Sequence, residues 1–327
     1  MKTRTLKIFA ETLPLKESFV IARGSKQAAD VVVVEIHEDG LIGRAEAVPY
    51  ARYGETMETV TAAIEHVKPF IENGMEKDSL QAALLPGAAR NALDCALWEL
   101  AAAAAEQPLW KVAGLPEPVA LQTAFTISLD TPAVMANKAK QAAAYPLLKL
   151  KLGGPDGLAA DLGRLAAVRQ ARPEAQIMVD INEGWSSADL LAHAEQLRHF
   201  DLTLIEQPVP EKEEAVLTRI DLPFCADESI HDCKDVGKLA GKYQWLNIKL
   251  DKTGGLTEAL RLVKTARQAN FKLMVGCMVS SSLALTPAYY LAQICDLVDL
   301  DGPLFLMQDR PAALRYKGAQ VSHPPAA

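Results

Sequence analysis

A recurrence of eight short apolar runs between residues 120 and 302 constrains the fold of this chain more than any other feature. The runs start about 20 to 30 residues apart, and amphipathic segments lie between them, for example at 158–173 and 256–271. Strands that alternate with helices run parallel, because each helix returns the chain to the same end of the sheet. Eight such units predict an α/β fold, a (β/α)8-type barrel. The runs are, in order, ALQTAFTIS, PLLKLKL, AQIMVDI, LTLIEQP, PFCADES, WLNIKLD, FKLMVGC and DLVDLDG.

The chain before these runs follows a different pattern. Residues 6–15 and 29–49 are typical of strands, and Asp39-Gly40 in the second segment predicts a tight hairpin turn. Helical periodicity then takes over in two segments, ETVTAAIEHVKPFIENG and GAARNALDCALWELAAAAAE. Strands followed by helices, without alternation, indicate a separate α+β unit.

A stretch rich in Gly and Pro at 114–120 marks the boundary between the two patterns. We therefore predict an N-terminal α+β domain at 1–115 and a barrel catalytic domain at 116–302, followed by a C-terminal segment at 303–327.

Composition excludes several classes of protein. The chain is 50% hydrophobic and 23% charged, as in soluble globular proteins, and its net charge of −7 argues against nucleic acid or an anionic membrane as the main partner. The five cysteines are scattered and lack a C-x-x-C pair, which favours reduced thiols. No apolar stretch approaches the roughly 20 residues of a membrane span, and the N-terminus is unlike a signal peptide. A cytoplasmic protein is expected, and a homo-oligomer remains possible.

Charged side chains gather at the C-terminal ends of the strand-like runs, where barrel enzymes build their active sites. Singly, an acid after a strand often caps a helix, and a lysine there is often solvated. Here acids end three consecutive strands, and strands ending in lysine flank them on both sides. The residues are Lys149 and Lys151 on strand 2, Asp180 on strand 3, Glu206 on strand 4, Asp227 on strand 5, Lys249 on strand 6, and Asp299 and Asp301 on strand 8.

The three acids predict a metal site. In a barrel, Asp180, Glu206 and Asp227 converge on one point of the mouth. Carboxylates without a histidine or cysteine partner favour a hard cation, so Mg²⁺ is expected, with Mn²⁺ as a substitute. No histidine has ligand spacing at a strand end; His231 comes closest and is expected at the surface.

The lysines predict proton transfer. Strands 2 and 6 lie four apart in a ring of eight, so Lys151 and Lys249 should approach a central ligand from opposite sides. A cation between them can stabilise the enediolate formed when a carboxylate substrate loses its α-proton. The neighbouring charge of Lys149 should lower the pKa of Lys151 and help it to act as a base. Two opposed bases suggest racemisation or epimerisation.

These motifs resemble the muconate-lactonizing subgroup of the enolase superfamily, over nearly the whole chain. The resemblance rests on KLKL, VDIN, IEQP, ADES, NIKLDKTGGL and AARNALDCALWEL. It implies an N-terminal α+β capping domain on a modified TIM barrel, (β/α)7β, with the C-terminal segment returning towards the cap. The lysine base and the Mg²⁺-stabilised enediolate are properties of that superfamily.

The last strand narrows the activity within this subgroup. DLDGP resembles the D-x-D of dipeptide epimerases, in which Asp299 and Asp301 would hold the α-ammonium of a dipeptide. FVIARGSKQAAD resembles the lid loop of L-Ala-D/L-Glu epimerases, so Arg23, with Lys26 as the second candidate, would pair with a glutamate side chain. The implied function is a Mg²⁺-dependent dipeptide epimerase, most specifically an L-Ala-D/L-Glu epimerase of murein peptide metabolism. The remaining predicted substrate contacts are Tyr53 in the second lid segment and Gly276 and Met278 after strand 7.

Three alternatives stay open. An o-succinylbenzoate synthase or an N-acylamino acid racemase shares the fold and the metal site. A barrel that binds a ligand without catalysis is the third, although two opposed bases argue against it. The sequence does not decide which dipeptide side chains are preferred.

Overall fold

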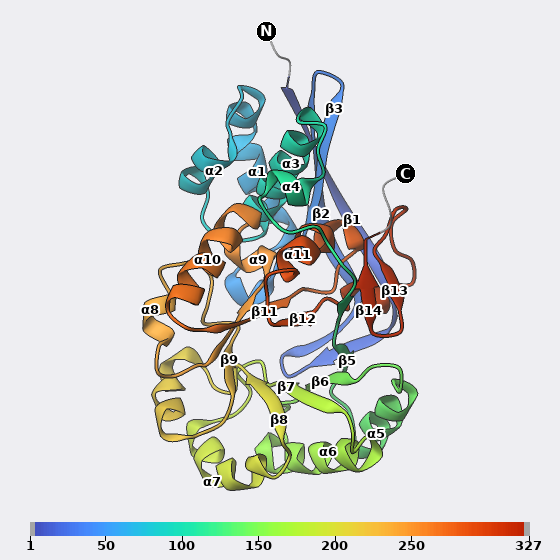
Figure 1. Ribbon diagram of the computed structural model, residues 1–327, viewed down its shortest axis with the longest axis vertical. Helices are drawn as coiled ribbons and strands as arrows, with labels where there is room; N and C mark the ends of the chain where they lie inside the picture. The colour runs from blue at the N-terminus through green and yellow to red at the C-terminus, as the bar shows by residue number, and fades with distance from the viewer. Residues whose placement is uncertain (1–3, 324–327) are drawn as a thin grey trace.

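The computed structural model describes residues 4–323 and contains three sheets. The first is antiparallel, in the order β1-β2-β3, and helices cover one of its faces (Figure 1). Asp39 and Gly40 join β2 to β3 with φ of 51° and 82°, which confirms the predicted turn. The elements of this part, called the cap below, are β1 (Arg4–Ile21), β2 (Gly24–Glu38), β3 (Leu41–Ala47), the 3₁₀ helix η1 (Ala51–Tyr53), α1 (Met57–Glu72), α2 (Lys77–Ala83), α3 (Ala88–Ala104) and α4 (Leu109–Val112).

The cap core forms because the apolar faces of its elements match. Thr56 caps α1 through a hydrogen bond from the Thr59 backbone N–H, and the helix buries the stripe Val60, Ile64, Val67 and Ile71. The interior of β2 is a continuous buried run, Val31 to Val34, because the strand packs on both faces. The close contact of β3 with α3 requires Gly43, where a Cβ would lie 2.0 Å from the Ala96 carbonyl oxygen.

The second sheet is the barrel, with eight strands in sequence order from β5 to β12, and it confirms all eight predicted strands. Neighbouring strands are parallel, and the Ala124 N–H bonds the Val298 carbonyl at 2.9 Å where the two edges of the sheet meet. The strands are β5 (Phe125–Ile127), β6 (Leu147–Lys151), β7 (Gln176–Asp180), β8 (Leu202–Glu206), β9 (Phe224–Ala226), β10 (Trp245–Ile248), β11 (Lys272–Gly276) and β12 (Leu297–Asp299). The helices between and after them are α5 (Pro132–Gln141), α6 (Gly157–Ala171), α7 (Ser187–Arg198), η2 (Glu211–Arg219), α8 (Val236–Leu239), α9 (Leu250–Thr253), α10 (Leu256–Gln268), α11 (Ser282–Ala292) and η3 (Gly302–Phe305).

An apolar plug fills the barrel below its mouth. Ala124, Leu147, Met178, Leu204, Cys225 and Met274 form one buried cluster. Because side chains alternate along a strand, the next inward positions towards the C-terminal ends carry the charged residues described below.

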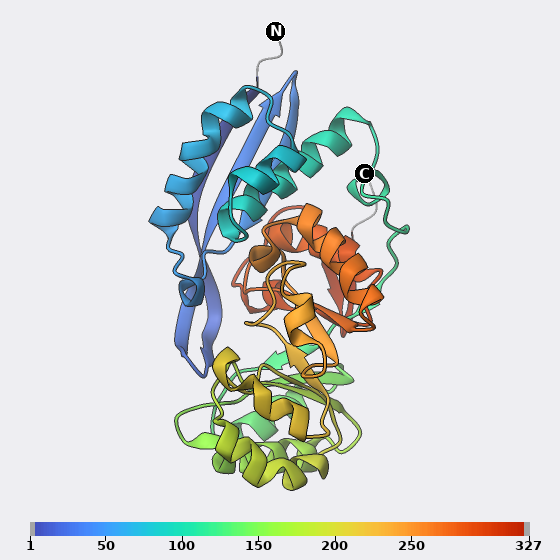
Figure 2. The ribbon, with the colours of Figure 1, turned by 90° about the vertical axis from the view of Figure 1, so that its left-hand side faces the viewer.

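The β1–β2 hairpin reaches from the cap to the barrel mouth (Figures 1 and 2). The Leu129 N–H after β5 donates to the Val20 carbonyl oxygen at 3.1 Å, and Leu15 forms an isolated bridge with Leu306. The segment predicted as a lid loop is therefore a hairpin end, with only Ala22 and Arg23 between the two strands. This end lies against the carboxyl edge of the barrel.

The C-terminal segment forms the third sheet together with β4 (Leu121–Gln122), in the order β13 (Arg315–Lys317), β14 (Gln320–Ser322), β4. Just before it, Arg310 donates to Glu46 and Glu11 of the cap. The segment thus contacts the cap, as the family resemblance implied.

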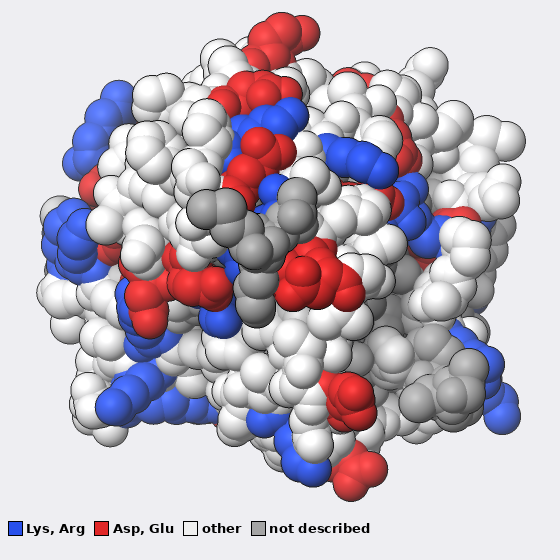
Figure 3. All heavy atoms as spheres, turned by 90° about the horizontal axis from the view of Figure 1, so that it is seen from above, with Lys and Arg blue, Asp and Glu red and all other residues white. Residues whose placement is uncertain are grey.

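The face of the molecule seen in Figure 3 carries mixed charge. On the face seen from above, acidic and basic side chains of the described residues are interspersed, without a broad basic field (Figure 3). No helix within residues 4–323 is long and apolar enough to cross a membrane.

Candidate active site

Three carboxylates from consecutive strands meet beneath the mouth. Asp180 ends β7, Glu206 ends β8 and lies beside it in register, and Asp227 follows β9. Ligand oxygens of the three lie within 4.8 Å of one another, and all three residues are buried. The parallel strands place the acids together, as predicted.

The donor set fits a hard divalent cation. All three groups offer oxygen, which Mg²⁺ and Mn²⁺ prefer. Glu206 Oε2 is buried and accepts no hydrogen bond, although Lys149 Nζ lies 2.7 Å from it. Asn247 fixes the other oxygen, since its Nδ2 donates to Glu206 Oε1 at 2.7 Å. Asn247 therefore holds one oxygen of Glu206, and the other is paired with the positive charge of Lys149, a partner that a cation could replace.

The two lysines of β6 point to the same side, into the barrel, as their spacing requires. Lys149 Nζ lies 2.6 Å from Asp299 Oδ2 and 3.3 Å from Asp180 Oδ2. Lys151 Nζ lies 2.5 Å from Asp180 Oδ2. Lys149 lies among three carboxylates and Lys151 is paired with one, which is how two like charges remain in one buried strand.

Lys249 approaches from the opposite side. It follows β10, four strands from β6, and its Nζ lies 2.6 Å from Asp227 Oδ2. Lys151 and Lys249 both line the same cavity. The predicted arrangement of two amines facing a common space is present.

Electrostatics ties these groups into one unit. Burial, reinforced by Asp180, raises the pKa of Glu206 to about 8. Burial also opposes the charge of Asp180, but Lys151 and Lys149 outweigh it and hold its pKa well below the usual range. For Lys249, burial is outweighed by Asp227 and Glu206, so its pKa is well above the ordinary value. Without a bound cation the ammonium groups are therefore the counterions of the acids.

Asp299, which ends β12, and Asp301, which follows it, lie at the wall of the same cavity. Asp299 Oδ2 accepts from Lys149 Nζ, while its Oδ1 is buried without a hydrogen bond. Asp301 Oδ2 accepts from the Thr126 backbone N–H at 2.6 Å, and burial together with Asp299 raises the pKa of Asp301 to about 7. The contacts with Lys149 and Thr126 were not predicted.

The cavity has a volume of about 410 Å³. Lysines form its floor, acids one wall, and the cap its cover. Residues that line it include Arg23, Lys26, Tyr50, Arg52, Lys149, Lys151, Lys249, Met278, Asp299 and Asp301.

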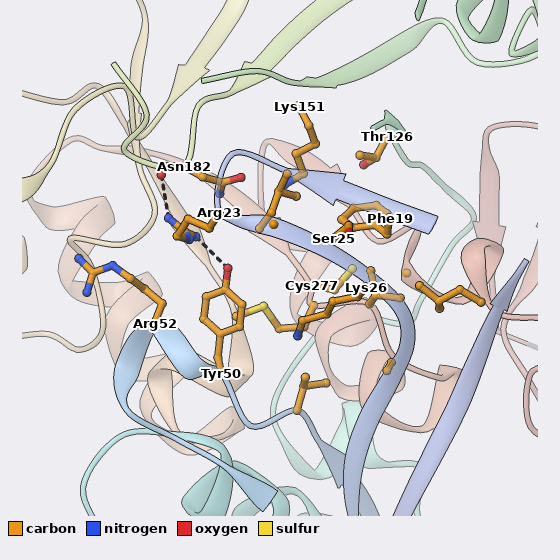
Figure 4. A pocket seen from close by; sticks show the side chains of 18 of the residues that line it. Phe19, Arg23, Ser25, Lys26, Tyr50, Arg52, Thr126, Lys151, Asn182 and Cys277 are labelled. Carbon is orange, nitrogen blue, oxygen red and sulfur yellow. Dashed lines mark hydrogen bonds between the residues drawn. The ribbon is translucent and has the colours of Figure 1, made fainter. Parts of the chain in front are cut away.

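Arg23 lines the cavity but is already bonded within the protein (Figure 4). Its Nη1 donates to the Asn182 carbonyl at 2.7 Å, and its Nη2 donates to Tyr50 Oη at 2.8 Å and Glu228 Oε1 at 2.6 Å. Glu183 accepts from Arg23 and, at 2.6 Å, from Arg52. The hairpin end is thereby fastened to the loops after β7 and β9.

The other two residues predicted to cover the cavity, Lys26 and Tyr53, differ in their exposure and in their contacts. Lys26 is exposed, and its Nζ lies 5.7 Å from the centre of the Tyr50 ring. Tyr50 rather than Tyr53 is among the cavity-lining residues; Tyr53 packs against Tyr50 and, at 4.6 Å between ring centres, against His231. His231 is half-buried by this contact, so it is only partly exposed at the surface, where the sequence placed it.

The segment after β11 lies beside the cavity. Gly276 ends β11, and a Cβ there would lie 2.6 Å from Asn247 Oδ1, while Met278 lines the cavity. Ser281 caps α11, but its backbone N–H donates to Glu46 and that of Ser282 to Asp309. These two N–H groups at the helix start are thus not free to bind a substrate carboxylate.

Several site residues were missed from the sequence. Lys252 and Asn247 contact the metal-site acids, and Glu228 and Tyr50 bind Arg23. Three of them lie within motifs that were recognised: Asn247 and Lys252 in NIKLDKTGGL, and Glu228 in ADES.

Comparisons with known proteins identify the family. Residues 3–114 match the model of the mandelate racemase / muconate lactonizing enzyme N-terminal domain, and residues 133–302 match the enolase C-terminal domain-like model. The chain is 45% identical to the L-Ala-D/L-Glu epimerase of Escherichia coli, over 97% of this chain and 99% of that protein. It is 41% identical to an N-acetyl-D-glutamate racemase of a Pseudoalteromonas species, over 89% and 92%.

Solved structures agree. An enolase family member from Agrobacterium tumefaciens with homology to dipeptide epimerases, solved with sodium and L-Ala-L-Glu, has a TM-score of 0.94 and 44% identity, over 99% of this chain and 98% of that one. A dipeptide epimerase from Enterococcus faecalis, solved with Mg and L-Leu-L-Tyr, has a TM-score of 0.92 and 29% identity, over 100% and 98%. With both family models matched in order along the chain, this protein belongs to the mandelate racemase / muconate lactonizing enzyme family of the enolase superfamily.

Proposed function

We propose that this protein is a Mg²⁺-dependent dipeptide epimerase that inverts the α-carbon of the C-terminal residue by 1,1-proton transfer, most specifically an L-Ala-D/L-Glu epimerase. The observation that carries the proposal is the pair of opposed amines, Lys151 and Lys249, at one cavity above three buried carboxylates. The Escherichia coli relative and the Agrobacterium structure with L-Ala-L-Glu support the choice of substrate.

Asp180, Glu206 and Asp227 would hold the Mg²⁺, for which Mn²⁺ could substitute. When bound, the cation supplies the positive charge that stabilises the substrate enediolate. With a cation bound, Asp180 and Asp227 would no longer serve as the ion-pair partners of Lys151 and Lys249, which would leave both amines available to the substrate.

Proton transfer would use both faces of the substrate. One neutral lysine, Lys151 or Lys249, removes the α-proton, and the opposite lysine returns a proton to the other face. Lys149, bonded to Asp299 and close to Glu206, would contact the substrate carboxylate and influence Lys151.

The cavity wall would bind the amino end of the dipeptide. Asp299 Oδ1 is a buried acceptor without a hydrogen bond, which is what an incoming α-ammonium requires. Asp301 beside it would share that charge. The distal carboxylate would be bound by Arg23, with Lys26 as the second cation, and Met278 would line the site. Tyr53 would support Tyr50 from behind, and Gly276 would leave room for Asn247.

The test is α-proton exchange in D₂O with Mg²⁺ and a set of L-Ala-L-X dipeptides, followed by NMR. Exchange with inversion, fastest for X = Glu, is expected. Preference for an apolar or cationic X would overturn the assignment of Arg23, and no exchange with any dipeptide would favour a binding protein without catalysis.

One alternative has its own support: the N-acetyl-D-glutamate racemase at 41% identity suggests an N-acylamino acid racemase. N-acetylglutamate has no ammonium and does not need Asp301. We expect Asp301→Ala to abolish turnover of L-Ala-L-Glu; if its best activity were on N-acetylglutamate and unchanged, the racemase would be correct. An o-succinylbenzoate synthase needs one lysine as base, so both lysines being essential would exclude it.

The remaining parts of the proposal are the setting and the division of the chain. Recycling or breakdown of murein peptides would place the enzyme in the cytoplasm, as a monomer or a homo-oligomer without a nucleic-acid or membrane partner. The domain boundaries at 115/116 and 302/303 are part of this proposal.

A further inference from the structure

The motif NIKLDKTGGL contains a second lysine that the proposed reaction does not use. Lys252 lies in α9, three residues after Lys249, and its side chain is completely buried. Its Nζ donates to the Asp227 backbone carbonyl at 2.5 Å, to Asp227 Oδ1 at 2.5 Å and to the Asn247 carbonyl at 3.0 Å. It therefore lies directly behind one of the three acids.

These contacts use all the hydrogens of an ammonium group. An ammonium has three N–H donors, and three acceptors lie within hydrogen-bond distance of Lys252 Nζ. Two of the three belong to Asp227, one on the main chain and one on the side chain. Lys252 thus binds both the backbone carbonyl and one side-chain oxygen of Asp227, which restricts rotation of the Asp227 side chain about χ1 and χ2. The other oxygen, Oδ2, stays directed towards Lys249 Nζ.

We propose that Lys252 is a positioning residue for the metal ion: it holds Asp227 Oδ1 so that Oδ2 is presented to the cation. The inference rests on the metal site of the proposed function. It assigns to Lys252 the role that hydrogen-bonding partners of metal ligands have in general, which is to orient the ligand.

The turn that carries Lys252 is itself anchored to the cap. Asp251 Oδ1 accepts from the Val48 backbone N–H and from Asn91 Nδ2, both at 2.9 Å. Arg90 of α3 donates to the carbonyls of Thr253 and Gly254. A turn of four residues held from the cap side is rigid enough to fix a lysine at its other side. The cap would thus act on the metal site through α9.

A purely structural role makes a different prediction. If Lys252 only satisfied buried carbonyls, its removal would lower stability and leave the cation affinity alone. Its charge beside Asp227 repels a second cation, so loss of that charge would even strengthen Mg²⁺ binding. Positioning predicts the reverse sign, because a carboxylate free to rotate binds the cation less well.

The test is titration of the chelator-treated full chain with MgCl₂ in a calorimeter, without substrate. We expect Lys252→Met to weaken Mg²⁺ binding about 10- to 100-fold, the usual effect of losing such a partner. Binding that is unchanged or tighter would overturn the proposal. A wild-type protein that does not bind Mg²⁺ would instead contradict the proposed function, so the two failures are distinguishable.

Arg172→Met is the matched control. Arg172 is also a buried cation that donates to backbone carbonyls, those of Ala139, Ala142 and Tyr145, but it precedes β7 at the opposite end of the barrel. The Arg172→Met variant should lose thermal stability and keep the wild-type Kd for Mg²⁺. If its Kd were also weaker, a general loss of stability would explain the effect of Lys252→Met, and the proposal would be overturned.

A second variant serves if Lys252→Met does not fold. Asn91→Ala removes one anchor of α9 and leaves the metal-site side chains in place. We expect a several-fold weaker Kd for Mg²⁺ with circular dichroism like that of the wild type. An unchanged Kd would overturn the role of the turn.

Discussion

The floor and the cover of the cavity are built in opposite ways. The floor consists of Lys149, Lys151 and Lys249 with their acids, all buried and all placed by the ends of strands. The cover consists of Arg23, Lys26 and neighbours on a hairpin end and on loops, and it is partly exposed. The floor is rigid because its strands are hydrogen-bonded to neighbours on both sides, whereas the hairpin end of the cover is bonded to the barrel by one backbone contact, from Leu129 to Val20, and by the side chain of Arg23.

This difference suggests a division of labour. Proton transfer needs groups fixed to within a fraction of an ångström, which strand ends provide. Selection among substrates needs contacts that can differ between relatives, which loops provide. Changes in the floor should therefore affect every substrate alike, and changes in the cover should affect only substrates with a matching side chain.

The largest expected effect comes from the floor. Lys151→Ala or Lys249→Ala should reduce epimerisation of any dipeptide at least about 100-fold, because each removes the only acid–base group on one face. Each variant should still exchange the α-proton of one epimer in D₂O, and the two variants should differ in which epimer that is. Near-normal turnover by either variant would show that two bases are not needed.

The residues of the floor could be predicted because local sequence patterns determine their positions. Lys149, Asp180 and Glu206 lie at positions that periodicity and strand order define, so their convergence follows from counting strands. The bonds of Arg23 do not: its partner Glu228 is 205 residues away along the chain, and no local pattern encodes which loop a hairpin end will contact.

The hairpin itself was missed for a physical reason. Residues 16–27 lack apolar alternation, and most of their side chains are exposed or half-buried, so the strand signal that burial normally imposes is weak there. The same holds for Tyr50 and Tyr53: the sequence placed aromatic residues near the mouth, but which of them lines the cavity depends on the fold of η1.

The cover should show a smaller and selective effect. Arg23→Ala should lower kcat/KM for L-Ala-L-Glu about 10- to 100-fold, which is the value of one charge-assisted contact. The kcat/KM for L-Ala-L-Gln should change little. The uncharged amide of the same shape is the control. Equal losses with both dipeptides would mean that Arg23 only fastens the hairpin through Asn182 and Glu228.

A third site lies where the cap meets the segment beside the cavity. Glu46 is buried and accepts from the Ser281 N–H and hydroxyl and from Arg310. Arg310→Ala should loosen the segment that carries Met278 and raise KM about three- to tenfold, with kcat unchanged. Steady-state kinetics with L-Ala-L-Glu checks this, and Arg315→Ala, an exposed arginine of the same C-terminal segment, is the control. A fall in kcat with constant KM would instead mean that the contact between Arg310 and Glu46 affects proton transfer rather than substrate binding.

The smallest effect concerns Asp251 of α9, which connects the cap to the barrel through its bonds with Val48 and Asn91. Burial raises the pKa of Asp251 to about 7, from about 4 in an unfolded chain. The folded protein therefore holds a proton that the unfolded chain releases, so the contribution of Asp251 to stability is complete below pH 4 and is lost as the pH rises through 7. Asp251→Asn keeps an oxygen for Val48 and Asn91 but never ionises. Urea unfolding of both proteins without metal should give similar free energies at pH 4 and a variant that is more stable by about 1 kcal/mol at pH 5, because each pH unit between the two pKa values changes the free energy by about 1.4 kcal/mol. Parallel pH profiles would mean that Asp251 is charged in the folded protein, and that cap and barrel are joined through an ion rather than through a neutral acid.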